Sequence, residues 1–350
     1  MARRPDNPRP GLVVIDKPQG LTSHDVVARV RRLAHTRKVG HGGTLDPMAT
    51  GVLVIGIGKA TKLLTWVSGH SKEYRATIRF GVATNTDDAE GVATAAVGCA
   101  SLSEEQLEAA LAPLRGDIMQ VPSTVSAIKV NGKRAYALAR AGEDVELAAR
   151  PVRISRLQVL APPRPAEYVC DEADGENVPD AELPSGPVSV VDVDVVVECS
   201  SGTYVRALAR DAGEALGVGA HLTALRRTRV GDVTVESAVT LDELSAAVEA
   251  ATLEGEPEAE PILPLVPLGE AARTMFPALL LTEAEAGAFA HGQAPRHSRG
   301  ELAQWATEVG YRPDGSSEEE ASPIAALAPD GTVLGLLRID EARLRTVLVF

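Results

Sequence analysis

The chain has 350 residues, 45% of them apolar, which is enough to bury the cores of one large domain and one small one. It contains no run of about 18 apolar residues that could cross a membrane. The apolar stretch after the basic N-terminus is too short for a signal peptide. The three cysteines, Cys99, Cys170 and Cys199, predict neither a disulfide framework nor a zinc site. We therefore expect a folded cytoplasmic protein without a membrane span.

The net charge of −13 is unevenly distributed along the chain. Residues 1–80 hold 14 Lys and Arg against 5 Asp and Glu, whereas residues 81–350 hold 21 against 43. Two acidic tracts, 161–186 and 236–260, contribute to this excess and are typical of solvated or loop segments. The basic first part is either an incidental feature of composition or an electrostatic footprint for nucleic acid.

Hydrophobic periodicity, caps and turn residues predict an irregular alternation of strands and helices. The predicted strands lie within residues 11–18, 51–58, 72–81, 150–160, 187–200, 221–235, 323–329 and 331–339. The predicted helices lie within residues 22–35, 101–116, 135–147, 207–217 and 241–265, the last of which ends in a linker. Thr22 or Ser23 is the expected cap of the first helix, and Ser103 that of the second. This irregular order favours an α+β fold over a doubly wound one.

A change of composition near residue 270 predicts a domain boundary. We expect a basic N-terminal tail over residues 1–10 and a large domain over residues 11–270. An acidic insertion at about 161–186 interrupts the large domain. A small β-rich module follows over residues 271–350, with a second loop insertion at 311–322.

The stretch GHGGTLDPMATG, residues 40–51, places four glycines around a single carboxylate. Glycine is used where the backbone needs unusual dihedral angles or something must come close. Pro47 keeps Asp46 away from helical geometry, so we expect Asp46 at a shaped bend with its side chain presented. Taken alone, the pattern is more typical of a turn Asp that bonds its own backbone.

Three other patterns predict chemistry less well. GIGKAT, residues 56–61, lacks the Ser or Thr that a P-loop requires after its Lys. His24, His35 and His41 lack the spacing of a metal site, so no metal is expected. ECSSGTYVR is not the G-x-S-x-G elbow of a serine hydrolase.

Four segments in order resemble the bacterial tRNA pseudouridine 55 synthase family, the TruB family. They are VIDKPQGLTSHDVV, GHGGTLDPMATGVLVIGIGKATKL, KEYRATIRFGVATNTDDAEG and SGTYVRALARDAG, and the likeness covers nearly all of residues 11–235. The resemblance implies a pseudouridine synthase catalytic domain over residues 11–270, with a mixed, largely antiparallel sheet flanked by helices. Residues 271–350 are similar, more weakly, to the family's PUA-like RNA-binding module.

The resemblance also implies roles for individual residues. Asp46 falls at the family's catalytic aspartate, Tyr74 at the tyrosine that packs against the target base, and Arg206 at the arginine that pairs with the aspartate. His41 matches a histidine that contacts the displaced RNA loop, and Lys17 with Pro18 is expected to brace the cleft. The residues expected to bind substrate or RNA are His41, Lys17, Tyr204, Lys59, Lys129, Gly43 and Thr44.

One segment departs from the family pattern. PSTVSAIK, residues 122–129, stands where the family usually has P-P-x-(Tyr/Phe)-S-A-x-K. Ser123 replaces a Pro and Val125 replaces an aromatic residue, while Ser126 and Lys129 remain. We therefore expect one packing contact near the active site to differ.

The family's reaction breaks the N1–C1′ bond of uridine, rotates the uracil and joins its C5 to the same sugar carbon. Nothing is oxidised and no group enters, so no cofactor is expected. A carboxylate can stabilise the positive character at the sugar, as in glycosidases. Asp46 either attacks C1′ or removes a C2′ proton to give a glycal, and sequence does not choose between them. Both roles need an ionised carboxylate in a dry cleft, for which a bidentate Arg206 is the expected counter-charge.

The resemblance thus implies that a monomer without an obligatory protein partner isomerises uridine 55 in the TΨC loop of tRNA. The stacked target base must be flipped out, with Tyr74 as its stacking face. One alternative is a tRNA-remodelling protein, an RNA chaperone, that uses the same fold; intact Asp46, Tyr74 and Arg206 argue against it. Another is a guide-RNA particle subunit like the archaeal and eukaryotic relatives, but this chain has no long basic tail.

Overall fold

A computed structural model describes residues 9–124, 129–130, 133–134, 147–170, 183–184, 186–253, 263–311, 323–341 and 343–350. At 129–130, 133–134 and 251–253 it describes the backbone alone. The helix predicted within 135–147 lies almost entirely outside the described residues, as do Val125 and Ser126. Most of the predicted basic tail and of the insertion at 311–322 also lies outside them.

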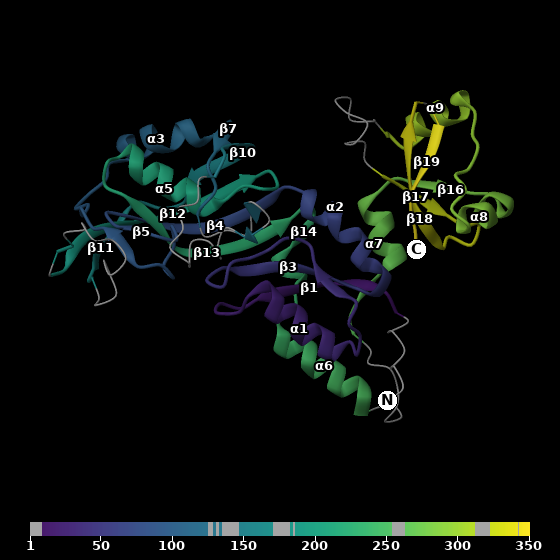
Figure 1. Cartoon of the computed structure of the whole chain (residues 1–350), viewed down its shortest axis with the longest axis horizontal. Coiled ribbons are helices and arrows are strands. Elements are labelled where there is room, and N and C mark those ends of the chain that lie inside the picture. The colour runs from purple at the N-terminus through teal and green to yellow at the C-terminus, as the bar shows by residue number, and fades with distance from the viewer. Residues whose placement is uncertain are drawn as a thin grey trace.

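One large sheet of 11 described strands runs through most of the molecule in the order β15-β1-β3-β13-β4-β12-β10-β7 (Figure 1). The bounds of these strands are β15 Val266–Pro267, β1 Gly11–Lys17, β3 Thr50–Ile57, β13 Ala220–Val230, β4 Lys72–Phe80, β12 Val188–Cys199, β10 Arg150–Val159 and β7 Gly116–Gln120. Three more strands pair alongside: β2 (Val39–His41) with β3, β11 (Arg164–Tyr168) with β12, and β14 (Val233–Thr234) with β13. Among the described strands of this sheet, only β3 and β13 pair in parallel. The predicted mixed, largely antiparallel sheet of an α+β fold is confirmed.

The strands follow the predicted patterns of burial. On β4, Tyr74, Ala76, Ile78 and Phe80 are buried while Arg75 between them is exposed, which is the predicted alternation. β3 is buried along nearly its whole length, as expected of a run of apolar β-branched residues. β4 also contributes residues to the wall of a pocket in this half of the molecule.

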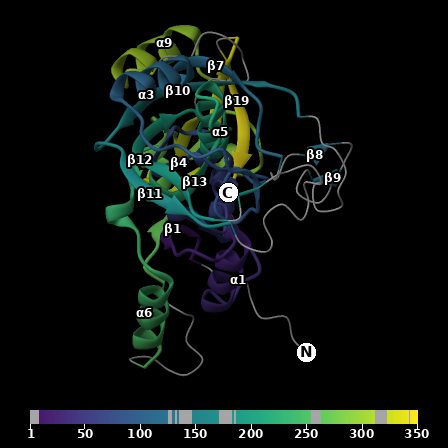
Figure 2. The ribbon, with the colours of Figure 1, turned by 90° about the vertical axis from the view of Figure 1, so that its left-hand side faces the viewer.

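Helices cover the two halves of this sheet separately (Figures 1 and 2). α3 (Glu104–Leu111) and α5 (Val205–Ala215) lie over the half that contains β4 and β12. α1 (Ser23–Leu33) and α6 (Leu241–Leu253) lie together against the half that contains β1. Between them, η1 (Gly58–Leu63) leads into α2 (Leu64–Gly69). The shorter described elements are β5 Ala83–Thr84, β6 Ala93–Ala95, η2 Ala112–Leu114, β8 Lys129–Val130, β9 Lys133–Arg134 and η3 Val235–Ser237.

α1 begins where its cap predicts. Thr22 Oγ1 accepts from the Asp25 N–H at 3.1 Å, and Asp25 in return accepts from the Thr22 N–H at 2.9 Å. This capping box satisfies two N–H groups that the first turn leaves without a helical partner. The buried residues Val26, Val27 and Val30 then face the core. Of the two predicted caps, Thr22 is the one used.

A second sheet lies beyond α7 (Leu268–Met275), at the end of the molecule away from β11 (Figure 1). It has the order β16-β17-β18-β19 and carries two helices. The bounds are β16 Ala278–Leu280, α8 Glu283–Ala290, α9 Arg299–Glu308, β17 Ile324–Leu327, β18 Val333–Asp340 and β19 Arg343–Val349. The predicted strands are present, but the two helices were missed, although each begins at a capping box.

Part of the predicted acidic insertion forms a strand. The interpretation of 161–186 as loop material is wrong for Arg164–Tyr168, which form β11 and pair with β12. Arg164 holds that strand by an ion pair with Asp194, a contact between residues far apart in the sequence.

No described helix is long and apolar enough to cross a membrane.

Candidate active site

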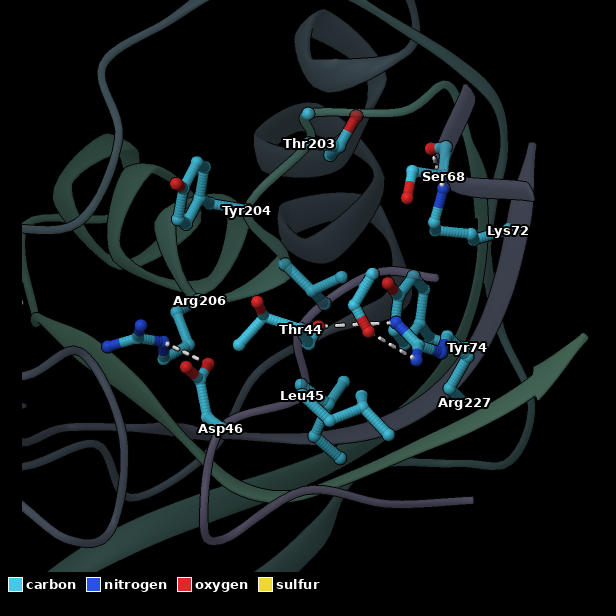
Figure 3. A pocket seen from close by; sticks show the side chains of 14 residues that line it. Thr44, Leu45, Asp46, Ser68, Lys72, Tyr74, Thr203, Tyr204, Arg206 and Arg227 are labelled. Carbon is cyan, nitrogen blue, oxygen red and sulfur yellow. Dashed lines mark hydrogen bonds and ion pairs between the residues drawn. The ribbon is translucent and has the colours of Figure 1, made fainter. Parts of the chain in front are cut away.

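A cavity of about 260 Å³ opens where the loop between β2 and β3 meets β4, β13 and the N-terminus of α5 (Figure 3). Its walls come from chain segments that are far apart in sequence. Of the ten residues proposed from the sequence, six line it: Asp46, Tyr74, Arg206, Tyr204, Gly43 and Thr44.

The loop that carries Asp46 is shaped by a glycine and held by a serine. Gly51 has a φ of +99°, in the left-handed region that favours glycine. A Cβ there would lie 2.1 Å from the Arg227 carbonyl oxygen, so β13 could not approach β3 with any other residue. Ser23 Oγ on α1 donates to the Leu45 carbonyl at 3.0 Å and accepts from the Leu45 N–H at 2.8 Å. These contacts fix the residue directly before Asp46.

Asp46 and Arg206 form the charged centre of the pocket (Figure 3). Arg206, the second residue of α5, is 3% exposed, and its Nε lies 3.0 Å from Asp46 Oδ2. Its Nη1 donates to the Thr86 carbonyl at 2.7 Å and lies 3.3 Å from Asp88 Oδ2. Sequence reasoning considered only the pair with Asp46. In the fold, two carboxylates share this buried guanidinium.

The surroundings of Asp46 shift its pKa. Burial raises the pKa of this carboxyl above its ordinary value, the Arg206 guanidinium opposes that rise, and the Asp88 charge adds to it. The side chain still has 36% of its surface exposed, on the side that faces the cavity. A carboxylate held in this way is more basic than a free one, which suits it to act as a nucleophile or a base.

Tyr74 and Leu225 give the pocket an apolar side. Tyr74 on β4 is 7% exposed, and burial raises the pKa of its phenol, so it is neutral at physiological pH. Leu225 lines the cavity from the neighbouring strand β13. Tyr204, the N-cap residue of α5, is held on both sides of its peptide by Gln120, which accepts from its N–H at 2.9 Å and donates to its carbonyl at 3.1 Å.

Arg227 is a pocket residue that sequence reasoning missed. Its guanidinium donates from Nε to the Val52 carbonyl at 2.7 Å, from Nη1 to the Thr44 carbonyl at 3.3 Å and from Nη2 to the Gly43 carbonyl at 3.1 Å. The residue is 1% exposed, so it ties the loop of Asp46 to β13 from inside. A signal was present: Arg227 falls two residues after Leu225, on the buried face of the strand.

Lys72 is a second pocket residue that the sequence analysis missed. It stands two residues before Tyr74 on the buried face of β4 and lines the cavity. Its Nζ donates to the Ser68 carbonyl at 2.9 Å and to the His70 carbonyl at 2.7 Å, at the end of α2. Burial lowers the pKa of Lys72 to about 8, with the Arg227 charge acting in the same direction.

Lys17 is buried, so the expectation that it contacts RNA directly is wrong. It is 0% exposed and donates from Nζ to the carbonyls of Pro18 at 2.9 Å, Leu21 at 2.6 Å and Pro47 at 3.2 Å. Three acceptors match the three donors of an ammonium group. Lys17 therefore lies beneath the loop of Asp46 and holds it through the Pro47 carbonyl, in line with the expected bracing.

The remaining predicted residues lie outside the pocket or cannot be placed. His41 ends β2, with its ring 5.6 Å from that of His24, and its buried Nδ1 has no partner among the described residues. Burial lowers the pKa of His41. Lys59 is exposed on η1, and only the backbone of Lys129, on β8, is described. Within the described part of the chain, no cluster of three or more His, Cys, Asp or Glu side chains could hold a metal ion.

Comparison with known proteins places this arrangement in a family. Residues 31–205 match the description "TruB family pseudouridylate synthase (N terminal domain)", and residues 206–267 match "tRNA pseudouridylate synthase B C-terminal domain". The chain belongs to the TruB family of pseudouridylate synthases. As a TruB family member it is an isomerase that makes pseudouridine. Neither match extends into residues 271–350, so the PUA-like interpretation of that module stays a prediction.

Relatives of the TruB family resemble the chain over nearly its whole length. A tRNA pseudouridine synthase B of Arthrobacter sp. is 49% identical over 340 residues, 97% of this chain and 96% of the relative. One of Mycobacteroides abscessus is 54% identical over 285 residues, 81% of this chain and 84% of the relative.

Solved structures share the fold at low sequence identity. An H/ACA RNP bound to a substrate RNA containing 2′-deoxyuridine matches with a TM-score of 0.61 at 22% identity, over 97% of this chain and 84% of the other. A Cbf5-Nop10-Gar1 complex matches with the same figures, a TM-score of 0.61 at 22% identity. At this identity the likeness shows the TruB fold alone.

Proposed function

We propose that the protein converts uridine 55 in the TΨC loop of tRNA to pseudouridine. One observation carries the proposal: Asp46, 3.0 Å from the buried Arg206, faces a cavity of about 260 Å³ whose other side is Tyr74. The relatives named tRNA pseudouridine synthase B support tRNA as the substrate. The position within the tRNA is what the resemblance of the sequence motifs to the tRNA pseudouridine 55 synthase family implies.

Asp46 acts on the sugar in this mechanism. As the C1′–N1 bond breaks, its electron pair leaves with the uracil, and positive character develops at C1′. The Asp46 carboxylate either bonds to C1′ or takes a proton from C2′, and both routes balance the charge without a cofactor. The detached uracil turns and its C5 bonds to C1′, while Asp46 leaves C1′ in the first route or returns the proton to C2′ in the second. C5 then loses its proton to water and N1 takes one up, so the product is an isomer of uridine. Arg206 keeps Asp46 oriented and favours its ionised form before the bond to uracil breaks.

The walls of the cavity have a separate task, which is to hold a base outside its stack. A uridine inside an RNA loop must be flipped out before any side chain can reach C1′. Tyr74 offers the aromatic face for this base, a contact of the kind worth about 1–3 kcal/mol. Its neutral phenol and the neighbouring Leu225 exclude water around the reacting atoms.

Phosphates of the tRNA would bind to a basic surface formed by α1 and the turn after it. The exposed cations of α1 and the turn after it are Arg29, Arg31, Arg32, Arg37 and Lys38. Together they place positive charge on an otherwise acidic protein, which suits a polyanionic substrate. We also propose a monomer without an obligatory protein partner, a catalytic domain over 11–270 and an RNA-binding module over 271–350.

Pseudouridine mapping tests the function directly. Unmodified tRNA is incubated with the protein or with Asp46→Asn, labelled with carbodiimide and read by primer extension. A mark at position 55 with the parent alone supports the proposal. Marks at another uridine would overturn the position. Salt-sensitive tRNA binding without any mark would favour the tRNA-remodelling alternative and leave Asp46 as a turn residue.

A further inference from the structure

Arg210 stands one turn after Arg206 on α5 and is the centre of a second charged cluster. Its guanidinium lies 3.4 Å from Asp87 Oδ2 and 2.7 Å from Asp211 Oδ1. It also donates to the Val121 carbonyl at 2.8 Å. The side chains of Arg210 and Asp87 are only 22% and 13% exposed, so water screens their attraction less than at an open surface.

Asp87 belongs to the same turn as the two groups that hold Arg206. Thr86 supplies the carbonyl that accepts from Arg206, and Asp88 supplies the second carboxylate. Asp87 itself has a φ of +59°, a left-handed conformation that is unusual for a residue other than glycine. The turn is also anchored by its backbone, because the Asp87 carbonyl accepts from the Leu222 N–H at 3.0 Å.

An additional contact at this turn involves Ser123, one of the departures from the family pattern. Ser123 is 0% exposed, and its hydroxyl lies near the Asp87 carboxylate without meeting the geometry of a full hydrogen bond. Burial raises the pKa of Asp87, while Ser123 and Arg210 both lower it. A proline at this position would offer no hydroxyl to the carboxylate.

We propose that Arg210 is a positioning residue for pseudouridine formation: by holding Asp87 and the Val121 carbonyl, it fixes the 86–88 turn that sets Arg206 against Asp46. The inference rests on the proposed function. The path is short, since Arg210 binds Asp87, Asp87 is joined by a peptide bond to Asp88, and Asp88 faces the guanidinium of Arg206. Arg210 does not line the cavity, so its effect on the pair is expected to run through the turn.

The test is a double-variant cycle on single-turnover pseudouridine formation. Arg210→Gln and Asp87→Asn are each expected to slow the chemical step by about tenfold while tRNA affinity changes less than about twofold, because a small displacement of catalytic groups costs rate. The variant carrying both substitutions should be no slower than the slower single one, since both remove the same contact. Asp211→Asn is the matched control: it removes a partner of Arg210 that does not reach the turn, and its rate should stay at the parental value.

Several results would overturn the inference. Slowing of less than about twofold by Arg210→Gln would show that the turn does not need it. If the rate losses of the two single variants multiply in the double variant, or if Asp211→Asn loses as much rate as Arg210→Gln, the substitutions act by general destabilisation. Thermal melting of each variant measures this destabilisation directly. A parent protein that forms no pseudouridine would overturn the proposed function as well, whereas an active parent with an unaffected Arg210→Gln would overturn only this inference.

Discussion

Asp46 and Asp88 compete for one guanidinium, that of Arg206, whose Nε faces the first and whose Nη1 faces the second. Arg206 is therefore not just a counter-charge. It sets the direction of the Asp46 carboxylate relative to a turn from another part of the chain, and a planar group with several donors is needed to do this. Three predictions at the scale of single residues follow from the geometry of this pair and its surroundings.

Replacing Arg206 by Lys should slow the chemical step by about a hundredfold, because a single ammonium cannot serve Asp46 and the 86–88 turn together. Binding of tRNA should change little, since the residue is buried. Single-turnover rates at saturating protein, with filter binding in parallel, measure the two quantities. Turnover near that of the parent would contradict the role of the pairing.

Replacing Tyr74 by Leu should remove most of the catalytic rate while keeping most of the RNA affinity. The change retains apolar volume but removes the aromatic face, a stacking contact worth about 1–3 kcal/mol that forms only after the base is flipped. Rates and tRNA dissociation constants are compared with those of the parent. An equal fall in both would show that Tyr74 is structural.

The rate should fall as pH decreases through a pKa above the ordinary aspartate value of about 3.9, because the reaction needs the ionised form of Asp46 and burial raises its pKa. Arg206→Gln should move this acid limb to still higher pH, since Arg206 opposes the rise. Single-turnover rates against pH check both statements. A limb that stays in place in the variant would show that another group titrates.

At the scale of elements, the site depends on where strands and helices end. The loop of Asp46 connects β2 and β3, and α1 reaches under it with Ser23 at its first position. α5 begins at Val205, directly after its N-cap Tyr204, so Arg206 falls in its first turn and its guanidinium reaches Asp46 of the loop. The start of α1 was predicted from its cap, and the bend at Asp46 from its glycine-rich stretch. The start of α5 was not, because the helix predicted within 207–217 leaves Arg206 outside it.

Ser23→Ala should destabilise the fold by about 1–3 kcal/mol, because it leaves the buried Leu45 N–H without its acceptor. It should also slow the reaction, since Leu45 precedes Asp46. Thr22→Ala is the matched control on the same helix end: loss of its cap should cost about 1 kcal/mol but leave the rate unchanged. Urea unfolding and single-turnover rates separate the two effects. Equal rates in both variants would show that Ser23 serves only stability.

At the scale of the whole molecule, the two sheets are joined by a common hydrophobic cluster. It contains Val52 and Val54 of β3, Val67 of α2, and Phe276 and Leu336 of the C-terminal part. Trp66 on α2 meets Phe276 edge-on, with ring centroids 5.7 Å apart. The C-terminal sheet is therefore packed against the large sheet through α7 and α2.

Charge is also a property of the whole molecule, because residues 1–80 are basic and the remainder is acidic. tRNA affinity should therefore fall steeply with salt despite the net charge of −13. Replacing Arg32 or Lys38 by Ala should lower the slope of log K against log salt by about one each. Replacing an exposed cation of the second sheet, Arg343, provides a comparison that reports whether that module also meets phosphate. An unchanged slope in the first two variants would place the RNA elsewhere.

Sequence by itself determined the α+β class, the long strands of the large sheet, the helices α1, α3, α5 and α6, the shaped bend at Asp46 and the family, because periodicity, caps, glycine spacing and motif order are local properties. It also named six of the fourteen residues that line the pocket. Only the tertiary structure decided that Arg206 serves Asp88 as well as Asp46, that Lys17 is buried beneath the loop, and that Arg227 ties the loop to β13. Those contacts depend on the parallel pairing of β3 with β13 and on the turn at 86–88, which join distant parts of the chain. The reason is physical: a buried cation is recognised by the carbonyls around it, and a sequence does not show which carbonyls folding will bring there.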